Sequence, residues 1–285
     1  MRLDVKTWLV VAIAGANLAL TAQSSSTSST GGPARGSLVL AGGVEQNAAI
    51  DAAFGALAGG PGSHIVVIPT ASLPETMPPE MLPDVVVFLA RRFKERFGVS
   101  AVTVLHTHDR ARSDADSFVE PLRRATGVWM MGGFPERLVQ SYLNTKTELA
   151  LRELLDRGGV VGGESAGAVI QGSWLDTTDG EFTPAILKLM QAHAAGGGFA
   201  LLTRAAVFPH FDARGPAAAV KESAAHPNHL AIGIDNQTAL IVKGTKAEAV
   251  GRGTVSLYNA SGPGASVVTI RHGERYDLAA RRKQE

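Results

Sequence analysis

The stretch VVGGESAGA at residues 160–168 decides how the rest of the chain is interpreted. A short apolar run leads into a serine surrounded by small residues, and a segment compatible with a helix follows. Gly163, Ser165 and Gly167 occupy the fixed positions of the G-x-S-x-G pattern. In this pattern small neighbours let the backbone turn sharply from a strand into a helix, so that the serine hydroxyl stands exposed. The stretch predicts a nucleophile elbow, and the alternative is a Gly-rich turn that contains a serine by chance.

The segments before the elbow alternate between apolar runs and helical patterns. Apolar runs without alternation are typical of strands covered on both faces. Five strands alternating with helices predict an α/β domain with a doubly wound, mainly parallel sheet. Such a sheet would place the loops at Gly42-Gly43, Gly132-Gly133 and Ser165 along one edge, where ligands bind. The predicted strands begin at residues 37, 64, 101, 127 and 160, and the predicted helices cover residues 46–58, 84–97, 113–124 (N-cap Ser113) and 135–156, the last in two pieces around Asn144.

The pattern becomes looser after Gly172, where β-rich stretches dominate. Helices are expected at residues 184–193 and 216–225, and an apolar strand at 201–208. Three further β-rich stretches cover residues 231–243, 255–258 and 266–271. The predicted domain therefore covers residues 37–275, and residues 276–285, which contain an Arg-Arg-Lys run, are expected to form a basic tail.

The N-terminal residues resemble an export signal. Arg2 and Lys6 precede an apolar run over residues 8–20 that is short for a membrane span, which is the layout of a secretory signal peptide over residues 1–22. An uncleaved anchor is the alternative. Residues 23–36, QSSSTSSTGGPARG, are expected to form a flexible linker. These features predict a secreted or periplasmic protein, with no stable membrane insertion after signal cleavage.

Composition excludes several classes of function. Without residues 1–22 the net charge falls from +1 to zero, because Arg2, Lys6 and Asp4 leave together, and a neutral surface argues against nucleic-acid binding. The chain has no cysteine, which excludes disulfides, a cysteine nucleophile and a thiolate metal site. No cofactor and no metal is assigned to the site.

A serine nucleophile needs a base, and His210 is the candidate among eight histidines. It follows an apolar strand and stands between Pro209 and Phe211, which would hold the ring at a sheet edge. The alternative is a buried strand-end histidine bonded to a carbonyl. The others, at strand ends, in turns or near the tail, fit structural roles better: His64, His106, His108, His193, His226, His229 and His272.

Several residues could complete the site. Asp235 or Asn236, in a polar turn after an apolar run, could orient the imidazole, and Asp176 and Asp179 are rival carboxylates. An ordinary turn explains the Asp235-Asn236 pair equally well. The oxyanion donors expected are the N–H of Ala166 and that of Gly133 or Phe134. For Gly42-Gly43 a simple turn is the expected role.

Five motifs together resemble the cyanophycinase and dipeptidase E family of serine peptidases. They are GGVEQN at 42–47, MGGFPERL at 131–138, GGESAGA at 162–168, PHFDARG at 209–215 and GIDNQTAL at 233–240. The resemblance implies a flavodoxin-like sheet akin to that of class I glutamine amidotransferases, with Ser165 as nucleophile and His210 as its base. It also implies substrates with peptide or isopeptide bonds next to acidic residues, and such families often form dimers.

The chain departs from that family around the substrate. Cyanophycinases typically carry Gly-Gly-Asp-Gln where this chain has Phe134-Pro135 after the glycines, and Asp-Gln where it has Phe208-Pro209. Of the arginines after the histidine only Arg214 remains, since Pro216 and Ala219 stand at the other places, and the family's Asp-Glu pair is Asp235-Asn236. Arg214 and Pro135 are therefore the candidate substrate-binding residues of an altered pocket, which should not hold the same β-aspartyl-arginine unit.

Three functions fit these observations. The first is an exported serine peptidase acting through a Ser165 acyl-enzyme, with a peptide or small acyl compound as its partner and a homodimer as a possible assembly. The second is a weak or inactive relative that binds peptides. The third is an esterase, which would order its triad as serine, acid, histidine.

Overall fold

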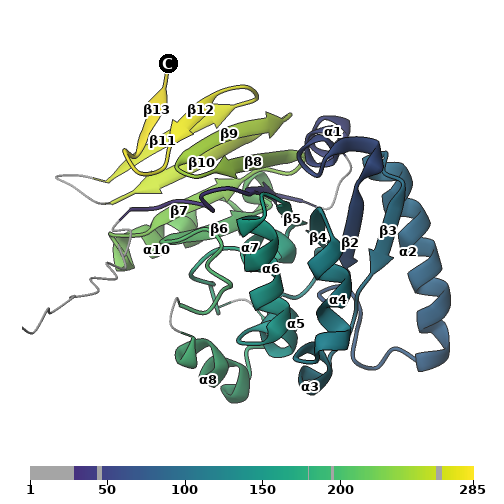
Figure 1. Cartoon of the computed structure of the whole chain (residues 1–285). Helices are drawn as coiled ribbons and strands as arrows, with labels where there is room; N and C mark the ends of the chain where they lie inside the picture. Colours follow the sequence, from purple (N-terminus) through teal and green to yellow (C-terminus); the bar gives the residue numbers. More distant parts are fainter. Residues whose placement is uncertain (1–28, 44–46, 179, 194–195, 261–264) are drawn as a thin grey trace, which may run out of the picture.

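The computed structural model describes residues 29–43, 47–178, 180–193, 196–260 and 265–285, and they form two sheets (Figure 1). The larger sheet has nine strands in the order β13-β12-β9-β8-β1-β5-β4-β2-β3, and the smaller has four in the order β11-β10-β7-β6. The strands of the larger sheet are β1 (Ser37–Ala41), β2 (His64–Ile68), β3 (Ala101–Val104), β4 (Gly127–Met130), β5 (Val160–Glu164), β8 (Thr238–Lys243), β9 (Lys246–Gly251), β12 (Arg275–Asp277) and β13 (Arg282–Gln284). Those of the smaller sheet are β6 (Ala205–Pro209), β7 (Leu230–Ile234), β10 (Thr254–Asn259) and β11 (Ser266–Arg271).

Helices cover both faces of the parallel half of the larger sheet, which consists of β1, β5, β4, β2 and β3. Successive residues of these strands point alternately into two cores, one on each face of the sheet. In one core, Val39 and Trp129 pack with Phe54 of α1 (Ala48–Leu57) and with Phe93 and Phe97 of α2 (Leu82–Phe97). Their neighbours on the strands pack with α4 (Asp116–Arg124), α5 (Pro135–Tyr142) and α6 (Lys146–Asp156). The predicted doubly wound fold is thereby confirmed.

The carboxyl ends of the parallel strands meet at one edge. Because β1, β4 and β5 run in the same direction, the loops that follow Ala41, Met130 and Glu164 come together there. This is the edge that the sequence predicts for the glycine pairs and Ser165. The fold therefore positions the candidate site as expected.

Local hydrogen bonds decide where two helices begin. The predicted break at Asn144 is present: Asn144 has a φ of 58°, and the Thr145 hydroxyl caps α6 by accepting from the N–H of Thr147. Ser113, expected as an N-cap, instead ends the short helix α3 (Arg110–Ser113), and its buried hydroxyl donates to Ser141 O at 2.6 Å. The Ser113 hydroxyl is used in this contact with Ser141 and does not cap a helix. The helix α4 begins at Asp116, three residues after Ser113.

The C-terminal part contains more strands than the pattern predicts. The stretch at residues 231–243 is divided between β7 of the smaller sheet and β8 of the larger one, with Gln237 at a φ of 53° between them. The smaller sheet is covered by α10 (Ala217–Ala225), which contacts β6, β7 and β10. Two more helices, α8 (Pro184–Ala192) and the single turn α9 (Phe211–Arg214), lie in the connections around β6.

Two segments expected to be loose pack against the domain. The predicted tail is wrong: β12 and β13 pair as an antiparallel hairpin at the edge of the larger sheet, and Lys283 contacts Glu274 at 2.5 Å. The hairpin forms because Tyr276 and Leu278 are fully buried. The end of the predicted linker is also held, since Thr30 is buried and Gly32 N donates to Gly244 O at 2.8 Å. The predicted signal peptide lies outside the described residues.

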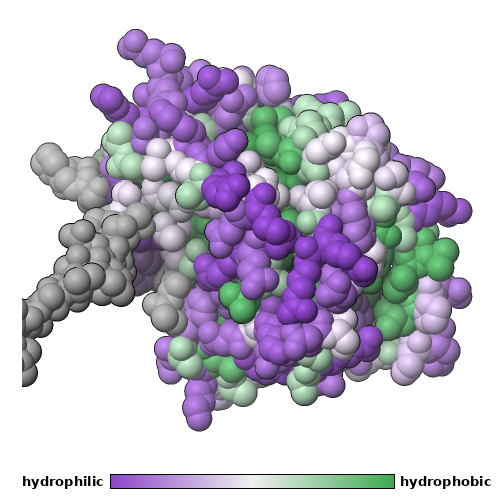
Figure 2. Space-filling model, viewed as in Figure 1, coloured by the Kyte–Doolittle hydropathy of each residue, from purple (hydrophilic) through white to green (hydrophobic). Residues whose placement is uncertain are grey.

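The surface seen in Figure 2 is mainly hydrophilic, with an apolar area on the side of α2. Val87 and Phe88 are exposed hydrophobic residues of α2. Within the described residues, no helix combines the length and the apolar character that crossing a membrane requires.

Candidate active site

Ser165 lies at a strained turn between β5 and α7 (Ala166–Val169). Its φ is 52° and its ψ is −116°, values that cost a non-glycine residue about 1–3 kcal/mol. The Ser165 N–H donates to Ala41 O at 3.0 Å and fixes the turn. A Cβ at Gly163 would lie 2.4 Å from Gly167 O, and one at Gly167 would lie 2.1 Å from Met130 O. The small residues of the pattern are therefore required, and the turn has the geometry of a nucleophile elbow.

The His210 imidazole meets the Ser165 hydroxyl. His210 follows β6 in a left-handed conformation with a φ of 54°, and its N–H donates to Gly42 O at 2.8 Å. The ring thereby reaches across to the elbow, where Nε2 lies 2.9 Å from Ser165 Oγ. This is the distance at which an imidazole can accept the serine proton.

Asn236 forms a hydrogen bond with the other nitrogen of the His210 ring. Its Oδ1 lies 2.7 Å from His210 Nδ1. A carboxamide oxygen only accepts hydrogen bonds, so Nδ1 carries the proton and Nε2 is left with the lone pair that faces Ser165. The asparagine thus selects the tautomer that a general base requires.

Asp212 fixes the orientation of Asn236, and the sequence reasoning did not single it out. Its Oδ1 accepts from Asn236 Nδ2 at 3.0 Å and from Asn236 N at 3.0 Å. Because the amide NH₂ donates to Asp212, the amide oxygen must face His210. Asp212 stands two residues after His210 in the PHFDARG motif, which is the signal that could have pointed to it.

The rival carboxylates do not take this position. Asp235 Oδ2 accepts from Thr254 N and Thr254 Oγ1, both at 2.8 Å, so it joins the turn after β7 to β10. Asp235 is therefore not the group that orients His210. Asp176 Oδ1 accepts from Thr178 N and Oγ1, and Asp179 lies outside the described residues.

Two backbone N–H groups can hold an oxyanion. Ala166 and Gly133 line the same cavity as Ser165, and within the described residues neither N–H makes a backbone hydrogen bond. Phe134 is the alternative oxyanion donor that the sequence predicts, but its N–H already donates to Ala71 O at 3.0 Å. A Cβ at Gly133 would lie 2.2 Å from Ala71 O, and its φ is +132°, so this position requires glycine.

Gly43 has a more specific role than the simple turn expected of it. A Cβ there would lie 2.2 Å from Asn236 Oδ1 and 3.4 Å from His210 Nδ1. The loop after β1 therefore passes directly against the His210–Asn236 contact, and only glycine leaves the room for it.

The cavity beside Ser165 has a volume of about 680 Å³. Arg214 lines it and is exposed. Glu136 also lines it, although it is only 4% exposed; its Oε1 accepts from Glu181 N at 2.9 Å, whereas Oε2 has no hydrogen-bond partner among the described residues. Asp176 is a second carboxylate in the wall. The rest of the wall is largely apolar and includes Phe134, Pro135, Val169, Val207, Phe208, Pro209 and Phe211. Both predicted substrate-binding residues, Arg214 and Pro135, thus lie in the wall of this cavity.

A buried cluster of charges lies directly behind the elbow. Arg96 of α2 contacts Glu164 at 3.0 Å and Asp51 of α1 at 2.8 Å, and all three side chains are at least nine-tenths buried. Burial raises the pKa of Glu164 and of Asp51, and the Arg96 charge opposes that rise. The cluster connects α1 and α2 to the last residue of β5, next to Ser165.

Comparison with known proteins places these features in a family. The model of peptidase family S51 matches residues 38–250. A cyanophycinase from Synechococcus elongatus is 30% identical over 203 residues, which are 70% of this chain and 60% of that protein. One from Geminocystis herdmanii is 29% identical over 248 residues, covering 84% of this chain and 85% of its own length. The chain thus spans less than two thirds of the Synechococcus relative.

Solved structures give the same fold. A peptidase from an acI-B1 actinobacterium superposes with a TM-score of 0.64 at 25% identity, over 87% of this chain and 98% of its own. A Listeria monocytogenes protein described as a putative peptidase E reaches a TM-score of 0.50 at 18% identity, over 77% of this chain and 100% of its own, which shows likeness of fold alone.

Proposed function

The chain belongs to peptidase family S51, and on that premise we propose that it is a serine peptidase that cleaves peptide or isopeptide bonds through a Ser165 acyl-enzyme. One observation carries the proposal: a continuous series of hydrogen bonds joins Ser165 Oγ, His210, Asn236 and Asp212 at the nucleophile elbow. A chain that only bound peptides would not need this alignment.

The geometry supports a two-step reaction. Ser165 Oγ attacks the carbonyl carbon of the substrate while His210 Nε2 accepts its proton, and the N–H groups of Ala166 and Gly133 bind the oxyanion. The imidazolium then gives the proton to the leaving amine. In the second step water, activated by His210, releases the acyl group from Ser165.

Asn236 and Asp212 replace the single carboxylate of a serine triad. Asn236 presents a neutral oxygen to the imidazolium, which stabilises the charge less than a carboxylate would. Asp212 contributes its negative charge from behind the amide, at 3.0 Å from Nδ2. The charge that balances the imidazolium is therefore one residue further away than in a triad with an acid at the third position.

The cavity suggests which substrates fit. Among the described residues Arg214 is the one arginine in the cavity wall, and its guanidinium suits a carboxylate next to the scissile bond. The Glu136 carboxyl group, one oxygen of which has no partner within the described part of the chain, suits an amino group or a basic side chain of the same peptide. We therefore propose short peptides with an acidic residue beside the scissile bond as substrates.

The test combines a serine-directed fluorophosphonate with a panel of peptides that carry α- or β-linked aspartate on either side of the scissile bond. Wild type should be labelled and should cleave some of the panel, whereas Ser165→Ala should do neither. Ser117→Ala, which changes an exposed serine, is the matched control and should behave as wild type. Equal labelling of wild type and Ser165→Ala would refute the proposal.

Two alternatives have distinct outcomes in the same experiment. A binding protein would leave the serine unlabelled and the panel intact; the 2.9 Å contact between Ser165 and His210 speaks against it. An esterase would be labelled but would cleave no peptide. Its expected order of serine, acid and histidine would use Asp176 or Asp179; Asp176 accepts from Thr178, Asp179 lies outside the described residues, and Asn236 is the residue that contacts His210 Nδ1.

Export and dimerisation remain proposals. The residues that would form the signal peptide are outside the described part of the chain, so cell fractionation of the full-length protein and of a form without residues 1–22 would test a secreted or periplasmic location. Sedimentation of the purified protein would test the homodimer.

A further inference from the structure

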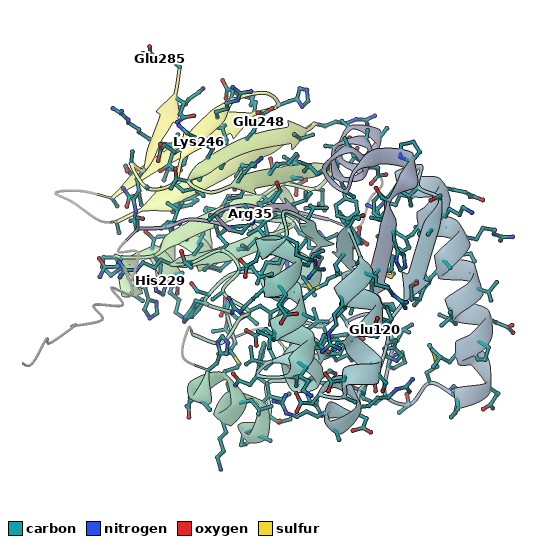
Figure 3. All side chains as sticks on the ribbon, in the orientation of Figure 1. Arg35, Glu120, His229, Lys246, Glu248 and Glu285 are labelled. Atoms are coloured by element: carbon teal, nitrogen blue, oxygen red, sulfur yellow. The ribbon has the colours of Figure 1, made fainter. Side chains whose placement is uncertain are left out.

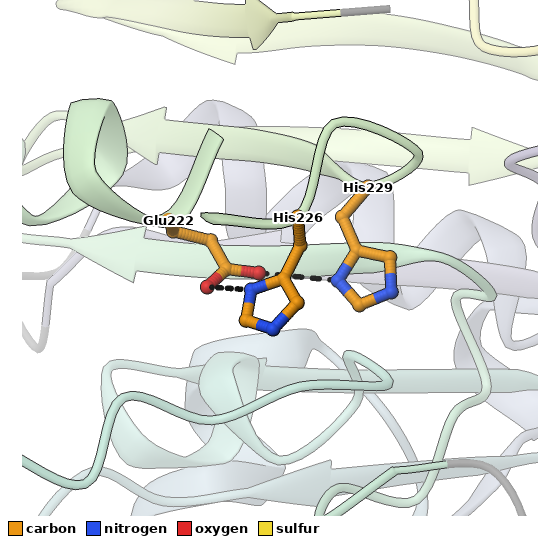
Figure 4. A group of neighbouring side chains, drawn as sticks. All are labelled: Glu222, His226 and His229. Carbon is orange, nitrogen blue, oxygen red and sulfur yellow. Dashed lines mark hydrogen bonds and ion pairs between the residues drawn. The ribbon is translucent and has the colours of Figure 1, made fainter. Parts of the chain in front are cut away.

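A second group of chemically active side chains lies at the far end of α10. Glu222 belongs to the last turn of this helix, and His226 and His229 follow it closely in the chain. Figure 3 shows His229 at one end of the smaller sheet, and Figure 4 shows both imidazoles facing the Glu222 carboxylate. None of the three lines the cavity beside Ser165.

The backbone fixes the spacing of the three residues. The N–H of His226 donates to Glu222 O at 2.9 Å and closes the helix, and the N–H of His229 donates to His226 O at 2.8 Å across the Pro227-Asn228 turn. Arg281 holds the same turn by donating to Asn228 O at 2.5 Å. The three side chains therefore converge on a scaffold that is ordered before any ligand arrives.

The distances between the side-chain atoms suit a metal ion. His226 Nδ1 lies 2.9 Å from Glu222 Oε2, His229 Nδ1 lies 3.1 Å from Glu222 Oε1, and the potential ligand atoms all lie within 4.8 Å of one another. In a tetrahedral site with metal–ligand bonds of about 2.0–2.2 Å, neighbouring ligand atoms are roughly 3.3–3.5 Å apart. Small rotations of the two rings are enough to admit an ion between them and the carboxylate.

From this geometry we propose that Glu222, His226 and His229 bind one divalent transition-metal ion of the zinc class. Two imidazole nitrogens and one carboxylate oxygen are ligands that zinc accepts, whereas calcium and magnesium prefer oxygen alone. Each imidazole binds through Nδ1 and keeps its proton on Nε2, and an imidazolium would release one proton on binding.

Burial divides the site into an inner anchor and an accessible side. The Glu222 side chain is only 2% exposed, so its charge is held in place inside the fold, while the side chains of His226 and His229 are 42% and 25% exposed. An ion can enter from the imidazole side, and water can complete its coordination there. The other end of α10 carries Ala217 and Ala218, which line the cavity beside Ser165. The ion would thus secure the helix that forms part of the cavity wall without touching the reacting groups.

The direct test is equilibrium dialysis of the full chain against ZnCl₂, with the bound metal measured by mass spectrometry. Wild type should bind one zinc per chain in a saturable manner. His226→Gln and His229→Gln should each weaken binding at least tenfold, and His272→Ala, which removes an exposed histidine elsewhere, should bind as wild type does. Absence of saturable binding by wild type, or unchanged binding by a His226→Gln/His229→Gln double variant, would overturn the proposal.

A second readout separates this site from the peptidase reaction and from folding defects. Circular dichroism without metal should show that the variants are folded, because the substitutions change exposed or half-exposed side chains. Zinc should then raise the Tm of wild type but not that of the double variant. Peptide hydrolysis by wild type should survive a chelator, since the ion lies outside the catalytic groups. An equal rise in Tm for the double variant would contradict the assignment.

Discussion

At the scale of single residues, Asp212 reaches His210 only through the side-chain amide of Asn236. Its carboxylate accepts both the Asn236 Nδ2 and backbone N–H groups at 3.0 Å. Without it, the Asn236 amide is free to rotate and to present NH₂ instead of oxygen to the ring. His210 Nδ1 would then lose its acceptor, and the tautomer that can deprotonate Ser165 would lose its advantage.

We predict that Asp212→Ala lowers kcat/KM for a cleaved peptide by about tenfold to a hundredfold, because hydrogen bonds to charged groups contribute about 1.5–3 kcal/mol. The loss should fall mainly on kcat, since Asp212 acts on the base and not on the substrate. Asp84→Ala, at an exposed position on α2, is the control. A KM effect with unchanged kcat would contradict this role.

The sequence predicts that Ser165 and His210 lie together, but it leaves open which residue contacts the other nitrogen of the His210 ring. Ser165 and His210 each have a local signal, a turn of small residues and a histidine at a strand end. Asp235 and Asn236 are neighbours in one turn and both favour turns, so only tertiary contacts decide between them. Asp235 bonds to Thr254 of β10, which leaves Asn236 to face His210. Likewise, the choice of Gly133 over Phe134 depends on one carbonyl, Ala71 O, that is remote in the chain.

At the scale of helices and strands, Arg96 ties α1 and α2 to β5. It is surrounded by aromatic rings, with its guanidinium carbon 4.9 Å from the Trp129 ring centre, and it forms ion pairs with two buried carboxyl groups. Taking away one member of a buried ion group leaves uncompensated charge behind.

We therefore predict that Arg96→Ala reduces the free energy of unfolding by about 3–5 kcal/mol, measured by urea denaturation at pH 7. Arg91→Ala removes an exposed arginine from the same helix and should change stability by less than about 0.5 kcal/mol. If Arg96→Ala and Arg91→Ala lower the free energy of unfolding by the same amount, the buried ion pairs of Arg96 do not account for the loss.

The sequence predicts the long, periodic elements well and the short edge strands poorly. The helix over residues 84–97 and the apolar strands of the parallel half have strong periodic or apolar patterns, and they are present. In contrast, β12 and β13 have three residues each, and β13 consists of Arg-Lys-Gln. Their pairing depends on the buried Tyr276 within β12 and Leu278 directly after it, two apolar positions in a segment whose other residues are mostly charged.

At the scale of the whole molecule, His106 makes stability depend on pH. Burial, followed by the nearby charge of His108, lowers the pKa of His106 from 6.5 to about 4. As the pH falls through 6.5, the unfolded chain takes up a proton at this residue, whereas the folded protein does so only near pH 4. The free energy of unfolding therefore falls as the pH drops from 6.5 toward 4.

We predict that His106→Asn makes the free energy of unfolding depend less on pH between pH 6.5 and pH 4. Urea denaturation at pH 7, 5.5 and 4.5 should show a smaller loss for the variant than for wild type, and His272→Asn, at an exposed position, should follow wild type. Parallel curves for wild type and His106→Asn would show that His106 does not contribute.

The position of β1 has a consequence for the newly made chain. β1 lies between β5, its parallel partner, and β8, which is antiparallel and begins at Thr238, directly after the turn that carries Asn236. Among the described residues β1 is the first strand to be synthesised, and its pairing with β8 joins segments some two hundred residues apart, a kind of long-range pairing that forms slowly. Until β8 is seated, Asn236 has no fixed place beside His210. A chain in which β8 has not yet paired with β1 would carry Ser165 and His210 without Asn236 at the imidazole, so the proposed catalytic arrangement requires a pairing between strands that are far apart in the sequence.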